Sequence, residues 1–165
     1  MSYQSVKAYF DQMEKGSYIT SRKQTGDTVE HAAEAIGCTP AEIAKAISFL
    51  VGGKTVMVVM AGDARVNSSK FKTYFHEKPG MVPREQVEAL VGHAPGGVCP
   101  FAVREGVPVY LDISLRRFAV VHTAAGTDMA TIRLTPAELE EYSHAAGWVD
   151  VCKGWLADEG AARSA

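Results

Sequence analysis

Cysteine is scarce in this sequence, and its few cysteines are not arranged in pairs. The 165 residues include 3 cysteines with no CxxC spacing, at Cys38, Cys99 and Cys152. An odd number of scattered cysteines argues against a disulfide framework and against a zinc site built on cysteine pairs. The 5 histidines likewise form no ligand pattern such as HExxH. We therefore expect neither a metal ion nor an organic cofactor.

The sequence also lacks a long apolar run. No stretch approaches the length of about 18 consecutive apolar residues that is typical of a membrane-spanning helix. The N-terminal residues include Lys7 and Asp11 and have no apolar region like that of a secretory signal. We therefore expect a cytoplasmic protein with no membrane partner.

Positive charge is not in excess. The chain has 17 Lys and Arg against 19 Asp and Glu, which gives a net charge of -2. Neutralisation of phosphates supplies most of the affinity of proteins that bind long nucleic-acid surfaces. The charge balance therefore argues against DNA as a partner, while a small contact with one end of an RNA stays compatible with it.

What the sequence does contain is the composition of an ordinary globular protein, with 47% hydrophobic and 22% charged residues. At this length a single hydrophobic core is the default. The apolar runs 46–51 and 55–60 flank Gly52-Gly53 and predict a β-hairpin. The second run is apolar nearly throughout, which is typical of a central strand covered on both faces.

Helices are predicted between the strands. Residues 39–42 and 135–138 both have the sequence Thr-Pro-Ala-Glu, a helix-start pattern, and Asp27 with Glu30 resembles a capping box. The predicted strands cover 18–21, 46–51, 55–60, 98–103, 108–111, 119–122, 131–134 and 148–151; the predicted helices cover 3–16, 27–36, 67–74, 83–91 and 135–146, with a short one at 39–42. This order favours a single-domain α/β (α+β) fold, in which a mixed β-sheet is flanked by helices.

The domain organisation follows from these elements. Residues 1–16 are expected to form an N-terminal helix packed on the domain, and residues 17–156 the domain itself. Residues 157–165 are small and polar and are expected to form a flexible C-terminal tail.

Lys45 is the first candidate site residue. It lies where a short predicted helix gives way to an apolar strand, so its side chain either extends to water or points into a pocket. A solvated lysine at a helix end is the simpler interpretation, and both remain open from the local pattern.

Two loops are further candidates. Residues 93–101 contain Gly96-Gly97 and Pro100, and backbone amides in such a loop can bind a carbonyl or an oxyanion. The alternative is a tight connection into a strand, and the loop is not a P-loop because GxxxxGK[ST] is missing. Residues 123–126 are small and either line a pocket or simply turn the chain. Cys99 suggests a nucleophile with His93 or His122 as its base, although a free cysteine is usually a buried apolar residue.

Five segments occur together in an order typical of one family. They are 41–47, 57–67, 96–101, 108–112, and 125–126 followed by 132–136. On these segments the chain resembles the YbaK family, also called the prolyl-tRNA-synthetase-associated (INS-like) editing domain, and the resemblance covers about residues 17–152. Members of this family hydrolyse the ester of mischarged tRNA, notably cysteinyl- or alanyl-tRNA for proline. The resemblance implies a mixed sheet with surrounding helices and one pocket for the 3′-terminal adenosine and its amino acid.

The resemblance also implies roles for individual residues. The functionally required lysine of the family falls on Lys45, which is the implied catalytic residue. The implied substrate-binding residues are the GxxxP loop and a strand end of small residues, namely Gly96, Gly97, Val98, Cys99, Pro100, Ala124, Ala125 and Gly126. Many relatives have serine in place of Cys99 and of Ala124, which argues against a nucleophilic role for Cys99 and removes a hydroxyl contact at Ala124.

The implied reaction needs no covalent nucleophile. An aminoacyl ester is already activated, so positioning and electrostatics suffice for its hydrolysis. The implied partners are the acceptor end of an aminoacyl-tRNA and an aminoacyl-tRNA synthetase that recruits the protein in trans. Two alternatives remain open, namely a non-catalytic module that binds a small ligand or a partner and a cysteine hydrolase that uses Cys99.

Overall fold

The computed structural model describes residues 2–23, 25–26 and 28–155. The predicted last residue of the domain, 156, and the predicted tail, 157–165, lie outside the described residues. The α-helices are α1 (Ser2–Gln12), α2 (Val29–Ile36), α3 (Ser68–Phe75), α4 (Arg84–Val91) and α5 (Pro136–Ser143), and the 3-10 helices are η1 (Gly16–Tyr18), η2 (Pro40–Glu42) and η3 (Ile113–Arg117). The strands are β1 (Ile19–Ser21), β2 (Ala44–Val51), β3 (Lys54–Ala61), β4 (Arg65–Val66), β5 (Val109–Asp112), β6 (Val121–Ala124), β7 (Ala130–Leu134), β8 (Gly147–Val149) and β9 (Cys152–Lys153).

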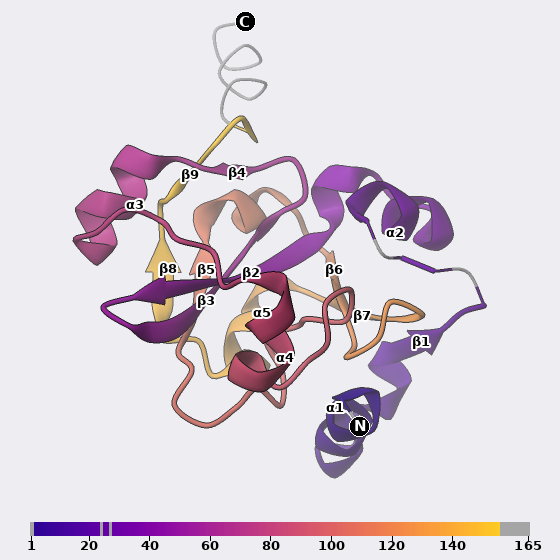
Figure 1. The fold of residues 1–165 in the computed structure, drawn as a ribbon. Coiled ribbons are helices and arrows are strands. Elements are labelled where there is room, and N and C mark those ends of the chain that lie inside the picture. The colour runs from indigo at the N-terminus through magenta and orange to yellow at the C-terminus, as the bar shows by residue number, and fades with distance from the viewer. Residues whose placement is uncertain (1, 24, 27, 156–165) are drawn as a thin grey trace, which may run out of the picture.

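These strands form a mixed α/β architecture, as predicted, but in more than one sheet. A four-stranded sheet has the order β2-β3-β5-β8, with an antiparallel first pair and two parallel pairs. A three-stranded antiparallel sheet has the order β1-β7-β6, and β4 pairs with β9. In Figure 1 the three-stranded sheet lies to the right of the four-stranded one, with α2 above it and α1 below it.

The predicted hairpin is present and positions the central strand. Gly52 and Gly53 have φ values of 58° and 78°, and positive φ at both positions suits a two-residue hairpin turn. Strand β3 lies between β2 and β5, and the six residues Val56–Ala61 are all buried. The prediction of a central strand covered on both faces is therefore confirmed.

Two element boundaries are set by local backbone chemistry. The Thr28 hydroxyl accepts the His31 N–H at 3.0 Å and caps α2, whereas the predicted cap Asp27 lies outside the described residues. Helix α5 ends at Ser143, earlier than predicted, because His144 adopts a left-handed φ of 52°.

The predicted strand at 98–103 is wrong. These residues form an irregular segment instead, in which Cys99, Pro100 and Phe101 are buried. Pro100 has no N–H to donate to a strand ladder, and Ala102 has a left-handed φ of 52°. The segment is a partly buried loop whose shape depends on its packing.

Among the helices of residues 2–23, 25–26 and 28–155, none combines the length and the apolar character needed to cross a membrane.

Candidate functional site

A cavity of about 210 Å³ lies where the start of β2 meets the three-stranded sheet. Ile43, just before β2, forms a parallel bridge with His122 of β6, which brings the two sheets together at this point. The cavity is lined by Gly26, Thr28, Val29, Ala32, Ile43, Ala44, Lys45, Ala46, Gly96, Val98, His122, Thr123, Ala124, Thr127, Asp128, Ala130 and Thr131. Small and apolar residues make up most of the lining, and the polar side chains among them are mainly threonines, with Lys45, His122 and Asp128. A mostly apolar lining with some polar groups is typical of a small-ligand site.

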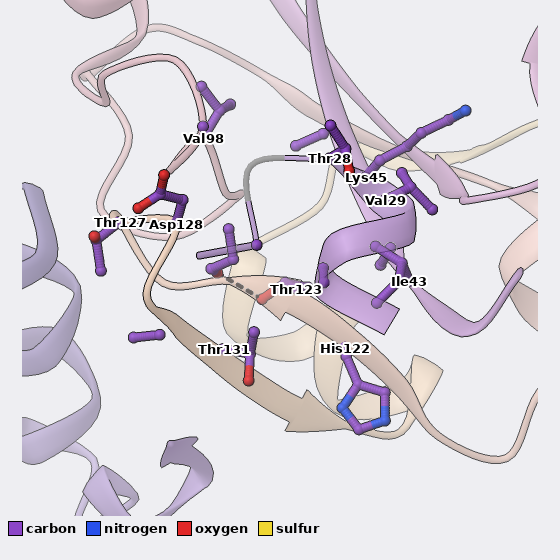
Figure 2. A pocket seen from close by; sticks show the side chains of 17 residues that line it. Thr28, Val29, Ile43, Lys45, Val98, His122, Thr123, Thr127, Asp128 and Thr131 are labelled. Carbon is purple, nitrogen blue, oxygen red and sulfur yellow. Dashed lines mark hydrogen bonds between the residues drawn. The ribbon is translucent and has the colours of Figure 1, made fainter. Parts of the chain in front are cut away.

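Lys45 lies within β2, not at a helix end, and it lines this cavity. Its Nζ donates a hydrogen bond to the Gly62 carbonyl oxygen at 3.3 Å. Burial is the largest effect on the pKa of Lys45 and lowers it, while the nearby Asp63 carboxylate acts in the opposite direction. Figure 2 shows the side chain extending past Val29, with its amine on the side away from Asp128.

Gly62 holds the acceptor of this hydrogen bond in a crowded position. A Cβ at Gly62 would lie 1.9 Å from the Pro40 carbonyl oxygen and 2.8 Å from a Val29 methyl group. The next residue, Asp63, forms a bidentate ion pair with Arg117 at 3.0 and 2.5 Å. The lack of a side chain at Gly62 allows this close packing, and the ion pair of Asp63 holds the loop that accepts the hydrogen bond of the Lys45 amine.

The predicted GxxxP loop is divided between the cavity and the core. Gly96 and Val98 line the cavity, whereas Gly97, Cys99 and Pro100 do not. The Gly97 N–H donates to the Ala94 carbonyl at 3.0 Å, so this amide is used within the loop and is not available to a substrate. Within the described part of the chain, the Val98 N–H has no acceptor.

The two glycine segments predicted separately lie against each other. The Gly126 N–H donates to the Gly97 carbonyl at 3.0 Å, and a Cβ at Gly97 would lie 2.5 Å from the Gly126 carbonyl carbon. Ala124 lines the cavity, but Ala125 is fully buried and Gly126 packs on Ser2 of α1. Of the small residues 124–126, only Ala124 contributes a side chain to the cavity wall, and Ala125 and Gly126 are packed behind it.

Cys99 and His93 are core residues. Both are fully buried, and the Cys99 Sγ lies 3.7 Å from the His93 Nε2 and from the Phe101 carbonyl oxygen. Burial raises the pKa of the Cys99 thiol to about 12, so the thiol is protonated near neutral pH. This environment is unsuited to a nucleophilic cysteine, and we do not retain that alternative.

Other polar residues of the cavity were missed by the sequence analysis or were given another role. His122, considered only as a base for Cys99, lines the cavity, and burial lowers its pKa. Asp128 lies opposite Lys45 (Figure 2), and its carboxylate accepts the Thr25 hydroxyl at 2.8 Å. The local sequence around Asp128 gave no signal that a carboxylate there would face a cavity. Among the described residues, no group of three or more His, Cys, Asp or Glu side chains could hold a metal ion.

Comparison with known proteins connects this chain to a family. The model of the aminoacyl-tRNA editing domain family matches residues 23–142. YwhH, an uncharacterized protein of Bacillus subtilis (strain 168), is 41% identical over 156 residues, which are 94% of this chain and 99% of that protein. A proline–tRNA ligase of Limosilactobacillus fermentum is 33% identical over 107 residues, which are 61% of this chain and 18% of the ligase.

Solved structures with a similar fold were also found. A candidate trans-editing enzyme for prolyl tRNA synthetase has a TM-score of 0.82 and 27% identity, over 93% of this chain and 98% of that chain. The hypothetical protein APE2540 has a TM-score of 0.81 and 25% identity, over 90% of this chain and 99% of that chain.

Proposed function

Since the chain belongs to the aminoacyl-tRNA editing domain family, we propose that it hydrolyses the ester bond of a mischarged aminoacyl-tRNA in trans, with the tRNA for proline as the tRNA it serves. The observation that carries this proposal is the position of Lys45, a half-buried cation in the wall of a small, mostly apolar cavity. The resemblance to proline–tRNA ligase and to a candidate trans-editing enzyme supports the choice of tRNA.

Lys45 is proposed to hold the terminal phosphate or a ribose hydroxyl of the acceptor end. An ammonium group has three donors, and one of them is directed at the Gly62 carbonyl. The other two are available to a substrate. Because the amine is partly removed from water, its attraction for an anionic or polar group is stronger than it would be at the surface.

The Val98 amide is proposed to hold the ester carbonyl. It replaces the Gly97 amide as the donor expected from the loop, because the Gly97 N–H already donates to Ala94. A fixed amide aimed at the carbonyl oxygen stabilises the charge that develops there during attack. Water is the proposed nucleophile, since the aminoacyl ester is activated and needs chiefly to be positioned.

Selection of the amino acid is proposed to depend on size. The cavity of about 210 Å³ is smaller than the roughly 300–1,000 Å³ of sites for drug-sized ligands. Its wall includes the small side chain of Ala124 and the branched side chains of Val29 and Ile43. A rigid wall excludes a group that is too large more effectively than a site rejects one that is too small.

The experiment that tests the proposal is deacylation of proline tRNA charged separately with cysteine, alanine, serine or proline. We expect hydrolysis of at least one non-cognate ester and no hydrolysis of the prolyl ester. If a folded protein hydrolyses none of them, the proposal fails. In that case, a rise in melting temperature with a free amino acid or a nucleotide would support the non-catalytic binding module instead.

The domain boundaries are also a proposal. We propose that α1, within residues 1–16, is a helix accessory to the deacylase domain of residues 17–156. Its packing supports this, because Val6 and Phe10 are fully buried and Ser2 contacts Gly126.

A further inference from the structure

One face of the three-stranded sheet extends from the cavity wall to the protein surface. Thr20 of β1 pairs with Thr131 of β7, and His122 of β6 pairs with Arg133 of β7. Side chains two residues apart on a strand point to the same face. Arg133 therefore lies on the same face as Thr131 and His122, and both of these line the cavity.

A second arginine crosses this face. Arg22 follows β1 and continues its pairing, because its N–H donates to the Met129 carbonyl at 2.7 Å. Its guanidinium donates to the Thr131 hydroxyl at 2.5 Å and to the Thr20 carbonyl at 3.4 Å. Arg22 is thus held beside a residue of the cavity wall.

Within the described part of the chain, neither Arg22 nor Arg133 forms an ion pair. The Arg133 side chain is exposed, and its guanidinium makes no hydrogen bond or ion pair with any residue in the described ranges. Arg22 and Arg133 both contribute to lowering the pKa of His122, after burial, so both lie close enough for their charge to reach it. Glu42 is the acidic group that acts on His122 in the opposite direction, and its carboxylate already accepts the N–H and the hydroxyl of Thr39 at 3.0 and 2.9 Å.

The charged face also has a continuation away from the cavity. A surface hollow beside it is lined by Arg133, Thr20, Ser17 and Thr135. Its lining also includes Glu138, whose carboxylate accepts the Tyr18 hydroxyl and the Thr135 N–H. Arg133 is therefore situated between this hollow and the cavity. A chain whose end occupies the cavity has a path over Arg22 and Arg133 into the hollow.

We propose that Arg22 and Arg133 form a phosphate-binding shelf that holds the backbone of the single-stranded acceptor end as it enters the cavity. This inference rests on the proposed function. Guanidinium groups suit the task because their planar donors bind phosphate oxygens in pairs. A shelf of two arginines also agrees with the net charge of -2, since few phosphates are contacted.

The test compares a substrate that has the single-stranded acceptor end of the RNA with one that lacks it. The variants are Arg133→Gln and the double variant Arg22→Gln/Arg133→Gln, and the control is Arg84→Gln, which removes an exposed arginine from α4. We expect kcat/KM for the non-cognate aminoacyl-tRNA to fall about tenfold or more in the double variant, since hydrogen bonds to charged groups are the stronger ones. The slope of log kcat/KM against log salt concentration should become shallower by about 0.7 for each lost phosphate contact.

A substrate without the acceptor-end RNA distinguishes an effect on the shelf from an effect on the cavity. For the same amino acid esterified to adenosine alone, the variants and the wild type should have equal kcat/KM. A shelf is ruled out if the variants lose activity equally on both substrates, or if the salt slope on tRNA does not change.

The shelf can also be judged if the proposed function fails. Should the wild type hydrolyse no ester, binding of an uncharged acceptor-stem minihelix is measured by fluorescence anisotropy at several salt concentrations. Weaker, less salt-dependent binding by the double variant than by Arg84→Gln supports the shelf, and equal binding by both overturns it.

Discussion

Lys45 and Gly62 are joined by a hydrogen bond of 3.3 Å from the lysine ammonium to the glycine carbonyl oxygen. Lys45 lies near the start of β2 and Gly62 directly follows β3, and these two strand ends are adjacent because Ala44 pairs with Ala61. The cation is thereby held in the cavity wall by the backbone, and this bond uses one of the three donors of the ammonium group.

Replacement of Gly62 by alanine should destabilise the protein. The added Cβ would lie 1.9 Å from the Pro40 carbonyl oxygen, so the loop must move. We expect a loss of about 1–3 kcal/mol in the free energy of unfolding, measured by urea denaturation. Gly80→Ala is the control, because a Cβ at Gly80 meets nothing within 4 Å in the described structure. Equal stability of the two variants would contradict the packing described for Gly62.

Thiol reactivity should be confined to Cys38 in the native protein. Cys99 and Cys152 are fully buried, and burial raises the pKa of both thiols, whereas Cys38 is only partly buried. We expect a disulfide reagent to modify Cys38 alone, and Cys38→Ala to remove the reaction. Rapid modification of Cys99 would show that its thiol is accessible.

Cys99→Ala should leave deacylation intact. The Cys99 side chain lies outside the cavity lining, so its removal affects packing only. A loss of about 1 kcal/mol in stability is expected, as for most core substitutions, with kcat/KM unchanged. Loss of activity in a protein that remains folded would restore the cysteine-hydrolase alternative.

The pH dependence of stability should reveal the burial of Lys45. Its pKa in the folded protein is lower than the ordinary value of 10.5, so the unfolded chain binds the proton more tightly. The free energy of unfolding is therefore reduced while the lysine is protonated, and it rises as the pH increases from the folded pKa towards 10.5. Lys45→Met should remove this alkaline rise and should be more stable than the wild type near neutral pH. An unchanged alkaline profile in Lys45→Met would contradict this assignment.

Enlarging Ala124 should change which esters are hydrolysed. Its side chain lines the cavity, so leucine at this position would occupy part of the 210 Å³. We expect the rate for the larger of two accepted esters to fall about 10-fold or more relative to the smaller, measured with tRNA charged with alanine and cysteine. Ala137→Leu, on α5 and exposed, is the matched control. Unchanged relative rates would exclude Ala124 from the selecting wall.

Local chemistry made much of the fold predictable. Helix α3 is capped by Asn67, whose side chain accepts the Lys70 N–H at 3.0 Å, and Gly52 and Gly53 turn the hairpin. These signals act over a few residues, so the sequence contains them directly. The segment 98–103 was mispredicted as a strand because its apolar residues belong to a partly buried loop.

The site was only partly predictable, because distant segments build it. Resemblance to a family implied Lys45 and the glycine loop, of which Lys45, Gly96 and Val98 line the cavity, but it did not reveal which amide of that loop is unpaired within the described residues. The packing of Gly97 on Gly126 and the position of Asp128 opposite Lys45 depend on how the sheets meet. No local pattern encodes these contacts.

The most direct test is the single-turnover rate of hydrolysis of a non-cognate ester on proline tRNA by wild type and by Lys45→Met. Lys54→Met, which removes an exposed lysine at the start of β3, is the control. We predict that Lys45→Met lowers the rate about a hundredfold, as expected for removal of a group that stabilises the transition state, while Lys54→Met retains the wild-type rate. Equal rates for wild type and Lys45→Met would contradict the central role given to Lys45.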